Sequence, residues 1–113
     1  MPKQKILIID DESDYCSIMQ NYLQEKDYAV SVAYTLSEGL NKITEEKPDI
    51  LFLDNNLPDG KGWVHVESIV EKNPHLKVFL VSAYHQRGDY KSPSTRVVVW
   101  EKPLSLNLLN ENF

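Results

Sequence analysis

Cysteine, basic charge and long apolar runs are all scarce in this sequence. Cys16 is the one cysteine among 113 residues, so an internal disulfide is impossible and a reducing compartment is expected. The 12 lysine and arginine residues are outnumbered by 17 acidic residues, which argues against direct nucleic-acid binding because that normally requires a basic face. The N-terminal stretch MPKQKILIIDDES has an apolar run too short for a signal peptide or a membrane span. We therefore expect a soluble cytoplasmic protein.

The length and composition are those of one globular domain. A chain of 113 residues is close to the usual size of a single domain, and 42% hydrophobic residues suffice for one core. The sequence contains no repeat, low-complexity tract or evident linker. We predict one domain that spans residues 1–113.

Apolar runs alternate with amphipathic stretches along the chain. Strands are predicted at residues 5–10, 28–34, 49–54, 76–83 and 95–102. Helices are predicted after Ser13 or Asp14 as N-cap, with Thr35 or Ser37 near the start of the second, over residues 63–73 and within residues 104–113. Alternation with short connections predicts a doubly wound α/β fold, in which helices cover both faces of a parallel sheet.

Three of the helices have apolar residues at helical spacing, whereas the expected fourth helix does not. The stripes consist of Ile18, Met19, Tyr22 and Leu23, then Leu36, Leu40 and Ile43, then Trp63, Val66, Ile69 and Val70. In residues 84–94, Gly88 lies mid-segment, Pro93 lies near the end and apolar residues are few. We predict a short or irregular helix there.

Polar residues follow four of the predicted strands. They are Asp10-Asp11-Glu12, Asp54, Ser82 and Glu101-Lys102-Pro103. In an open parallel sheet, ligands bind beyond the carboxyl ends of the strands, so these side chains are expected at one edge.

A cluster of carboxylates at that edge has a definite chemical use. Adjacent carboxylates repel and raise each other's pKa unless a cation intervenes, and Mg²⁺ prefers such oxygen ligands. A carboxylate beside Mg²⁺ can attack phosphorus and form an aspartyl phosphate, with a lysine and a hydroxyl stabilising the charge on the phosphoryl oxygens. Taken singly, the acidic run could instead favour a helix dipole, and Asp54 could cap a turn.

The motifs IIDDE, LFLDNNLPDG, LVSA and EKP stand in this order at successive strand ends. Together they resemble the receiver domain of two-component response regulators, and the resemblance covers nearly the whole chain. It implies a five-stranded, flavodoxin-like sheet, Mg²⁺ as cofactor, and a sensor histidine kinase or a phosphotransfer protein as partner. The domain would not be an enzyme in the usual sense, although it assists its own phosphorylation and dephosphorylation.

The resemblance also implies a role for each matching residue. It makes Asp54 the phosphoacceptor, with Ser82 and Lys102 as contacts of the phosphoryl group. It assigns the metal to Asp10, Asp11, Asp54 and the backbone carbonyl of Asn56, with Asp10 acting mostly through water. It further implies a cis peptide bond before Pro103, and it places Tyr84 and Asn56 beside the path of a hydrolytic water.

The chain departs from the family pattern in the region expected to transmit the signal. Val99 stands where the family usually has tyrosine or phenylalanine, and strand alternation puts Trp100 on the opposite face. The segment between Ser82 and Lys102 is short, and so is the final helix. The sequence is consistent with a stand-alone regulator and with a receiver cut from a longer regulator. It does not identify the downstream partner or output domain.

Two other functions are weighed against the phosphoacceptor. A receiver-like scaffold that binds proteins without phosphorylation is favoured by Val99 and opposed by the complete acidic site. A Mg²⁺-dependent phosphohydrolase would need a second acid soon after the nucleophile, and Asn56 cannot serve as one.

Overall fold

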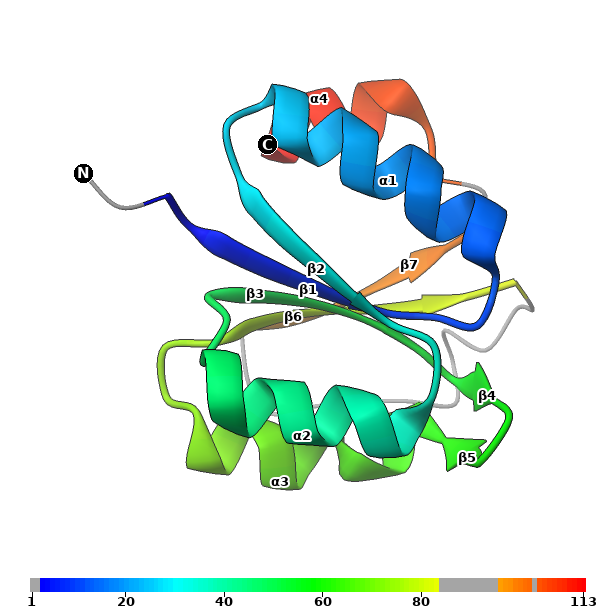
Figure 1. Ribbon diagram of the computed structural model, residues 1–113, viewed down its shortest axis with the longest axis vertical. Coiled ribbons are helices and arrows are strands. Elements are labelled where there is room, and N and C mark those ends of the chain that lie inside the picture. Colours follow the sequence, from blue (N-terminus) through cyan, green and yellow to red (C-terminus); the bar gives the residue numbers. More distant parts are fainter. Residues whose placement is uncertain (1–2, 84–95, 103) are drawn as a thin grey trace.

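The computed structural model describes residues 3–83, 96–102 and 104–113. Its main strands are β1 (Lys5–Ile9), β2 (Ala29–Ala33), β3 (Ile50–Asp54), β6 (Lys77–Ser82) and β7 (Val97–Glu101). Its helices are α1 (Ser13–Glu25), α2 (Leu36–Glu46), the 3₁₀ turn η1 (Gly62–His65), α3 (Val66–Lys72) and α4 (Leu106–Asn112). A short hairpin of β4 (Asn56–Leu57) and β5 (Gly60–Lys61) follows β3 (Figure 1).

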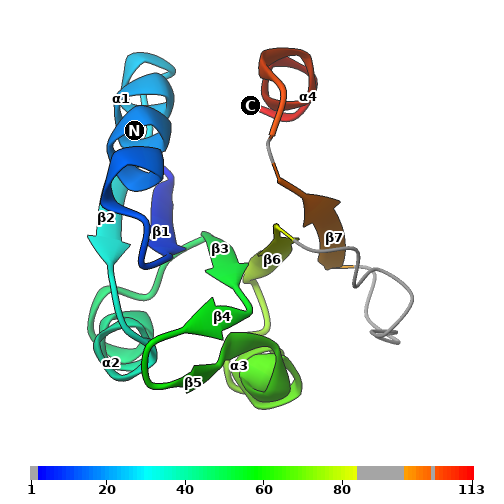
Figure 2. The ribbon, with the colours of Figure 1, turned by 90° about the vertical axis from the view of Figure 1, so that its right-hand side faces the viewer.

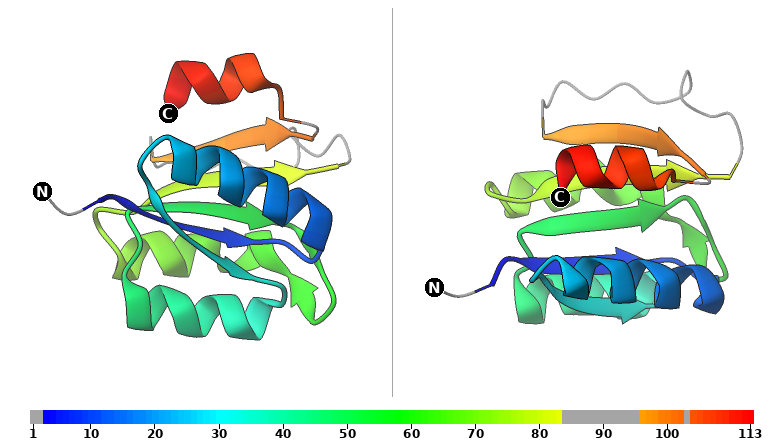
Figure 3. Two further views of the ribbon diagram at one scale, coloured as in Figure 1. Left: turned by 45° about the horizontal axis from the view of Figure 1, so that its top comes forward. Right: turned by 90° about the horizontal axis from the view of Figure 1, so that it is seen from above.

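The five main strands form one parallel sheet in the order β2-β1-β3-β6-β7. This confirms the predicted α/β fold, and each predicted strand is present with ends that differ by one or two residues. All five strands point toward the same edge of the sheet (Figure 3). Their carboxyl ends, and the polar residues that follow them, therefore lie together.

Helices cover both faces of the sheet, as Figure 2 shows. Helices α2 and α3 pack on one face over a core that includes Leu7, Leu51 and Leu80. Helices α1 and α4 pack on the other face over a second core that includes Ile8 and Phe79. Because β1 and β3 are buried on both faces, their sequences are continuous apolar runs.

Helix α1 differs in two details from the prediction. Ile18 was expected in the apolar stripe but is 68% exposed, and Cys16 takes its place in the core with Met19 and Leu23. The N-cap residue is Glu12 rather than Ser13 or Asp14, and its side chain makes no capping hydrogen bond. The stripe was misassigned because Ile18 neighbours Met19 in sequence, although adjacent helical residues point about 100° apart.

Helix α2 begins where the sequence predicts, with a second cap that the sequence does not reveal. The hydroxyl of Thr35 accepts a hydrogen bond from the amide of Glu38 at 3.1 Å. The carboxylate of Asp59 also accepts from the amides of Leu36 (2.7 Å) and Ser37 (2.9 Å). These bonds hold the pKa of Asp59 below its usual value. Asp59 thus ties the loop after β3 to α2.

The hairpin and η1 turn between β3 and α3 were not predicted as separate elements. The expected helix over residues 63–73 begins instead as the 3₁₀ turn Gly62–His65, and α3 itself ends at Lys72. Trp63 anchors this segment to β3, since its indole nitrogen donates to the carbonyl of Leu53 at 3.2 Å. Two-residue strands give too short a pattern for periodicity to detect.

The predicted fourth helix, with Gly88 and Pro93, and the bond before Pro103 lie outside the described residues. Within the described ranges, no helix combines the length and apolar character needed to cross a bilayer.

Gly62 is predicted to tolerate no side chain. A Cβ atom added there would lie 2.3 Å from the carbonyl oxygen of Asp54, a backbone atom that cannot rotate away. At Gly39 the corresponding clash, 2.4 Å, is with the end of the Ile9 side chain. We expect Gly62→Ala to lower the free energy of unfolding by about 2–3 kcal/mol and Gly39→Ala by less. Urea denaturation of both variants measures this, and the reverse order would contradict it.

Candidate phosphoryl-transfer site

Three carboxylates meet at the carboxyl edge of the sheet. Strands β1 and β3 are neighbours with Ile9 opposite Leu53. Asp10, which follows β1, and Asp54, the last residue of β3, therefore lie at the same level. Asp11 comes next along the chain, and one ligand oxygen from each of the three lies within 4.8 Å of the others. Asp10 and Asp54 are buried, with 2% and 5% of their surface exposed, while Asp11 is exposed. The structure thus brings together the acidic residues predicted from the strand ends.

Asp10 is paired with a lysine that comes from the far end of the chain. The ammonium of Lys102 lies 2.6 Å from an Asp10 carboxylate oxygen, and the amide of Glu12 donates to the other oxygen at 3.0 Å. Burial raises the pKa of Asp10, and these two contacts oppose that rise without cancelling it. Burial lowers the pKa of Lys102, but the hydrogen bond to Asp10 and the nearby charges of Asp10, Asp54 and Glu12 together raise it above its usual value. The contact with Asp10 holds the ammonium at the acidic edge.

Asp54 lacks such a partner. Within the described ranges, no lysine or arginine nitrogen lies within 4.0 Å of its carboxylate. Burial, followed by the nearby charge of Asp10, raises the pKa of Asp54 to about 6. Lys102 opposes this effect only through space. A buried carboxylate with a raised pKa favours the approach of a cation, because a cation would stabilise its ionised form.

Ser82 and Lys102 are joined through the backbone. Ser82 ends β6, is 2% exposed, and its carbonyl accepts from the amide of Lys102 at 2.8 Å. The pairing of β6 with β7 sets Ser82 opposite Glu101, so the next residue, Lys102, leaves the sheet beside Asp10. Non-local strand pairing is therefore what delivers the lysine to the acidic edge.

Asn56 lies in β4, two residues after Asp54. Its side-chain oxygen accepts from the ammonium of Lys61 at 2.7 Å, across the small hairpin. The neighbouring Asn55 holds the loop, since its carbonyl accepts from Gly62 and its side chain from Trp63. The amide side chain of Asn56 is thus engaged in the hairpin, and the role predicted for it concerns only its backbone carbonyl.

Two further contacts of Lys102 were not foreseen from the sequence. Its ammonium lies 3.3 Å from a carboxylate oxygen of Glu12 and 4.4 Å from the centre of the Tyr15 ring. Glu12 was part of the predicted acidic run, but nothing in the sequence pointed to Tyr15. Its place two residues into α1 puts the ring over the lysine, and only the packing of α1 against the sheet determines that contact.

The two faces of β7 separate the residues that depart from the expected pattern. Val99 packs into the core under α2 and α3, while Trp100 packs into the core under α1 and α4. The Trp100 ring lies 4.3 Å from that of Phe79, centre to centre, and 6.2 Å from that of Phe52. The prediction that these two side chains point in opposite directions is confirmed. Tyr84 lies outside the described residues.

Without a metal ion, the stability of the protein should depend on the charge of Asp54. Its pKa rises from 3.8 in the unfolded chain to about 6 on folding, so the folded state holds the proton more tightly. The protonated Asp54 therefore stabilises the folded state. This contribution is complete below about pH 4 and is lost as the pH rises through 6. In Mg²⁺-free buffer at pH 7, Asp54→Asn should therefore be more stable than wild type by about 1–2 kcal/mol, after allowance for solvent screening.

Urea denaturation between pH 4.5 and 7 measures this difference, which should shrink toward the acidic end. Asp14→Asn, an exposed aspartate in the first turn of α1, is the matched control and should show no such trend. A constant difference between wild type and Asp54→Asn across this range would contradict the prediction.

Tyr15 provides a separate test of the packing around Lys102. Its hydroxyl is buried and has no hydrogen-bond partner in the part of the chain that the structure describes. Tyr15→Phe should leave the free energy of unfolding unchanged or raise it by about 1 kcal/mol, because an unpaired buried hydroxyl is costly. Tyr15→Leu should lower it by about 1–2 kcal/mol, because the aromatic face over the ammonium is lost. A larger loss in Tyr15→Phe than in Tyr15→Leu, measured in urea, would contradict this view.

Comparison with known proteins places this geometry in a family. The family described as "Response regulator receiver domain" matches residues 6–94. The chemotaxis protein CheY of Listeria monocytogenes is 34% identical over 85 residues, which are 74% of this chain and 71% of that protein. A protein-glutamate methylesterase/protein-glutamine glutaminase of Trichodesmium erythraeum is 37% identical over 90 residues, which are 78% of this chain but 26% of that protein.

A solved structure indicates the same family as the sequence relatives. A two-component response regulator from Clostridium difficile superposes with a TM-score of 0.86 and 28% identity, over 96% of this chain and 91% of that one. The structural match extends through the region of β7 and α4, beyond the last residue of the family match. With its acidic edge, parallel sheet order and family match taken together, this chain belongs to the response regulator receiver domains of two-component systems.

Proposed function

We propose that the protein is a phosphoacceptor, and that Asp54 receives the phosphoryl group. The observation that carries the proposal is the convergence of Asp10, Asp11 and Asp54 within 4.8 Å, with Asp54 buried at the end of β3. A carboxylate in this position is largely shielded from bulk water and lies at the end of the strand where ligands bind in parallel sheets. The family match supports the same role.

The residues present suit Mg²⁺ as cofactor. Three carboxylates supply the hard oxygen ligands that Mg²⁺ prefers, and Asp10, Asp11, Asp54 and the carbonyl of Asn56 are the groups that would hold it. The pKa of Asp54, raised to about 6, indicates a site with more negative charge than Lys102 alone balances. Bound Mg²⁺ would supply the charge that lets an anionic carboxylate and an anionic phosphoryl group approach each other.

Asp54, Lys102 and Ser82 have different roles in the phosphoryl transfer. An oxygen of Asp54 forms a bond to phosphorus while the bond from phosphorus to the donor breaks, and the electron pair of that bond leaves with the donor. Lys102 and Ser82 are the groups that stabilise charge on the phosphoryl oxygens. Since Lys102 is paired with Asp10 at 2.6 Å in the structure, it must turn from Asp10 toward the phosphoryl group.

The chemistry also limits the partners. A phosphohistidine is a suitable donor, because its phosphorus–nitrogen bond leaves a neutral imidazole behind, so we propose a sensor histidine kinase or a phosphotransfer protein.

A scaffold that binds proteins without phosphorylation is the second candidate. Val99 favours it, because a small side chain packed in the core cannot swing as an aromatic ring does. A phosphohydrolase is disfavoured, because the side chain of Asn56 is bound by Lys61 and carries no acidic proton.

Phosphorylation by a small donor separates these candidates. Acetyl phosphate with Mg²⁺ should add one phosphoryl group to the wild-type protein, as measured by intact mass. Asp54→Asn should gain none, and Asp11→Ala should be labelled on the order of 100-fold more slowly, because loss of one ligand weakens the metal site.

Asp14→Asn is the control for removal of an acidic charge nearby and should be labelled like wild type. An unlabelled wild-type protein would favour the scaffold, and equal labelling of Asp54→Asn would mean that another residue accepts the group.

A further inference from the structure

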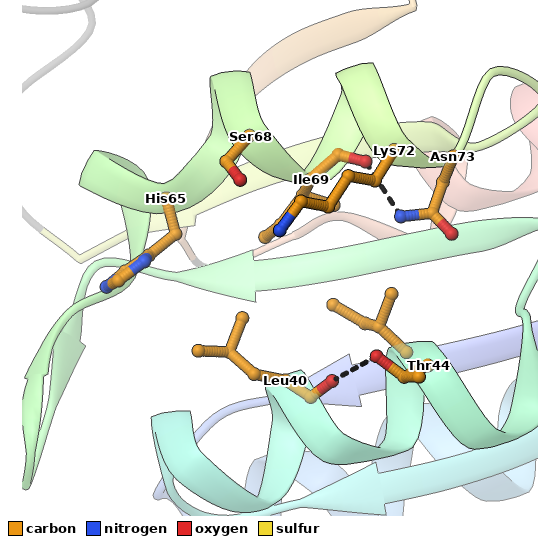
Figure 4. Close-up of a pocket in the computed structure, with 8 residues that line it drawn as sticks. Leu40, Thr44, His65, Ser68, Ile69, Lys72 and Asn73 are labelled. Atoms are coloured by element: carbon orange, nitrogen blue, oxygen red, sulfur yellow. Dashed lines mark hydrogen bonds between the residues drawn. The ribbon is translucent and has the colours of Figure 1, made fainter.

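A groove lies between α2 and α3, on the face of the sheet opposite α1. Its volume is about 230 Å³, and its apolar floor consists of Leu40 and Ile43 from α2 and Ile69 from α3. Figure 4 shows the side chains of α3 reaching across toward those of α2. Most of the surface of Leu40 and its neighbours is covered by the core beneath, so the exposed part of this floor is a narrow strip between the helices.

The rim of this groove is polar, and its charge is positive. It is lined by Thr44, His65, Ser68, Lys72 and Asn73. No carboxylate contributes to the lining. The groove therefore carries a lysine without an acid in its lining, although the chain as a whole has a formal net charge of −5.

The groove continues toward the amino-terminal edge of the sheet. A second depression of about 300 Å³ shares Lys72 and Asn73 with the first and adds Lys47 and His75. One carboxylate lines it, that of Asp49, and this group already accepts a hydrogen bond from the backbone amide of Lys5 at 2.8 Å. Both halves of the groove therefore present lysines to the solvent.

The Lys72 side chain can meet a ligand, because Arg96 rather than Lys72 binds the backbone carbonyls at the end of α3. A lysine in the last turn of a helix usually interacts with the free carbonyls there. In α3 the guanidinium of Arg96 donates to the carbonyls of Val70 (3.2 Å), Asn73 (3.0 Å) and Leu76 (2.9 Å). Among residues 3–83, 96–102 and 104–113, no carboxylate lies within 4.0 Å of the Lys72 ammonium.

Lys47 occupies a backbone position that does not suit a lysine. It ends α2 with φ of 49° and ψ of 64°, a left-handed conformation that glycine or asparagine adopts more readily. No ion pair of this lysine is formed within the described ranges either. The exposed Lys47 ammonium can therefore meet a charged ligand at this end of the groove.

From these observations we propose that the α2–α3 groove binds an acidic peptide segment of a partner protein. Its aliphatic side chains would rest on Leu40, Ile43 and Ile69, and its carboxylates would face Lys72 and Lys47. A peptide fits better than a small molecule, because two adjoining open depressions offer several weak contacts along a line. The groove reaches the opposite end of β3 from Asp54, so the proposal does not depend on phosphorylation.

The test is an amide NMR titration with the probe peptide acetyl-Glu-Glu-Leu-Leu-Glu-Glu-amide. Resonances of Leu40, Ile43, Ile69 and Lys72 should shift, with an affinity that falls as salt is raised. A peptide with lysine in place of glutamate and one with glycine in place of leucine are the matched probes, and both should bind more weakly. Asp54→Asn should bind like wild type, which separates this result from the fate of the proposed phosphorylation.

Variants of the protein decide whether the groove lysines are responsible. The double variant Lys47→Glu/Lys72→Glu should bind about 10-fold more weakly, as expected for two exposed ion pairs. Lys26→Glu, the same charge change at the end of α1 on the other face, should bind like wild type.

Lys47→Gly should also bind more weakly while retaining full stability, because glycine suits the left-handed position. The proposal is overturned by shifts outside the groove, by an equal response to the lysine peptide, by unchanged affinity in the double variant, or by the absence of any shift at millimolar peptide.

Discussion

A single ammonium group, that of Lys102, lies among the carboxylates at the carboxyl edge of the sheet, and the architecture of this edge depends on it. Asp10 and Asp54 are both buried, and two buried like charges are costly without a cation between them. Lys102 pairs with Asp10 at 2.6 Å and leaves Asp54 with a pKa raised to about 6. The edge therefore keeps more negative charge than Lys102 balances, and a bound cation would offset that excess.

The topology that creates this edge also separates the molecule into two differently charged ends. The chain leaves β1 outward to β2 and then crosses back to β3, so the loops after β1 and β3 diverge and leave an opening between them. Asp10, Asp11 and Asp54 line that opening. At the other end of the same strands, Lys47 and Lys72 line the groove beside α2 and α3. One sheet therefore presents an acidic site and a basic groove that can act independently.

Strand β7 determines how an event at the acidic edge can reach the rest of the molecule. Trp100 is half-buried and packs within an aromatic cluster with Phe52, Phe79 and Phe113. Val99, on the other face, is small and half-buried. The ends of β6 and β7 are joined by the backbone, since the amide of Lys102 donates to the carbonyl of Ser82.

The sequence alone determined the five main strands, the parallel sheet and most of the acidic edge, but not the short hairpin or the 3₁₀ turn after β3. Buried strands read as apolar runs, and parallel strands must place their ends together, so Asp10, Asp11 and Asp54 could be grouped before any coordinates were known. The same local reasoning failed for Ile18, where neighbouring apolar residues left the face of α1 ambiguous.

Tertiary structure decided what depends on contacts between distant segments. The pairing of Lys102 with Asp10, the ring of Tyr15 over that lysine, and the cap that Asp59 provides for α2 each join residues whose separation in sequence carries no periodic signal. The α2–α3 groove forms because two helices pack side by side. Separately, Arg96 occupies a backbone carbonyl at the end of α3 with which the Lys72 side chain could otherwise interact. Patterns in a sequence record which face of an element is buried, whereas packing determines which charges meet at its surface.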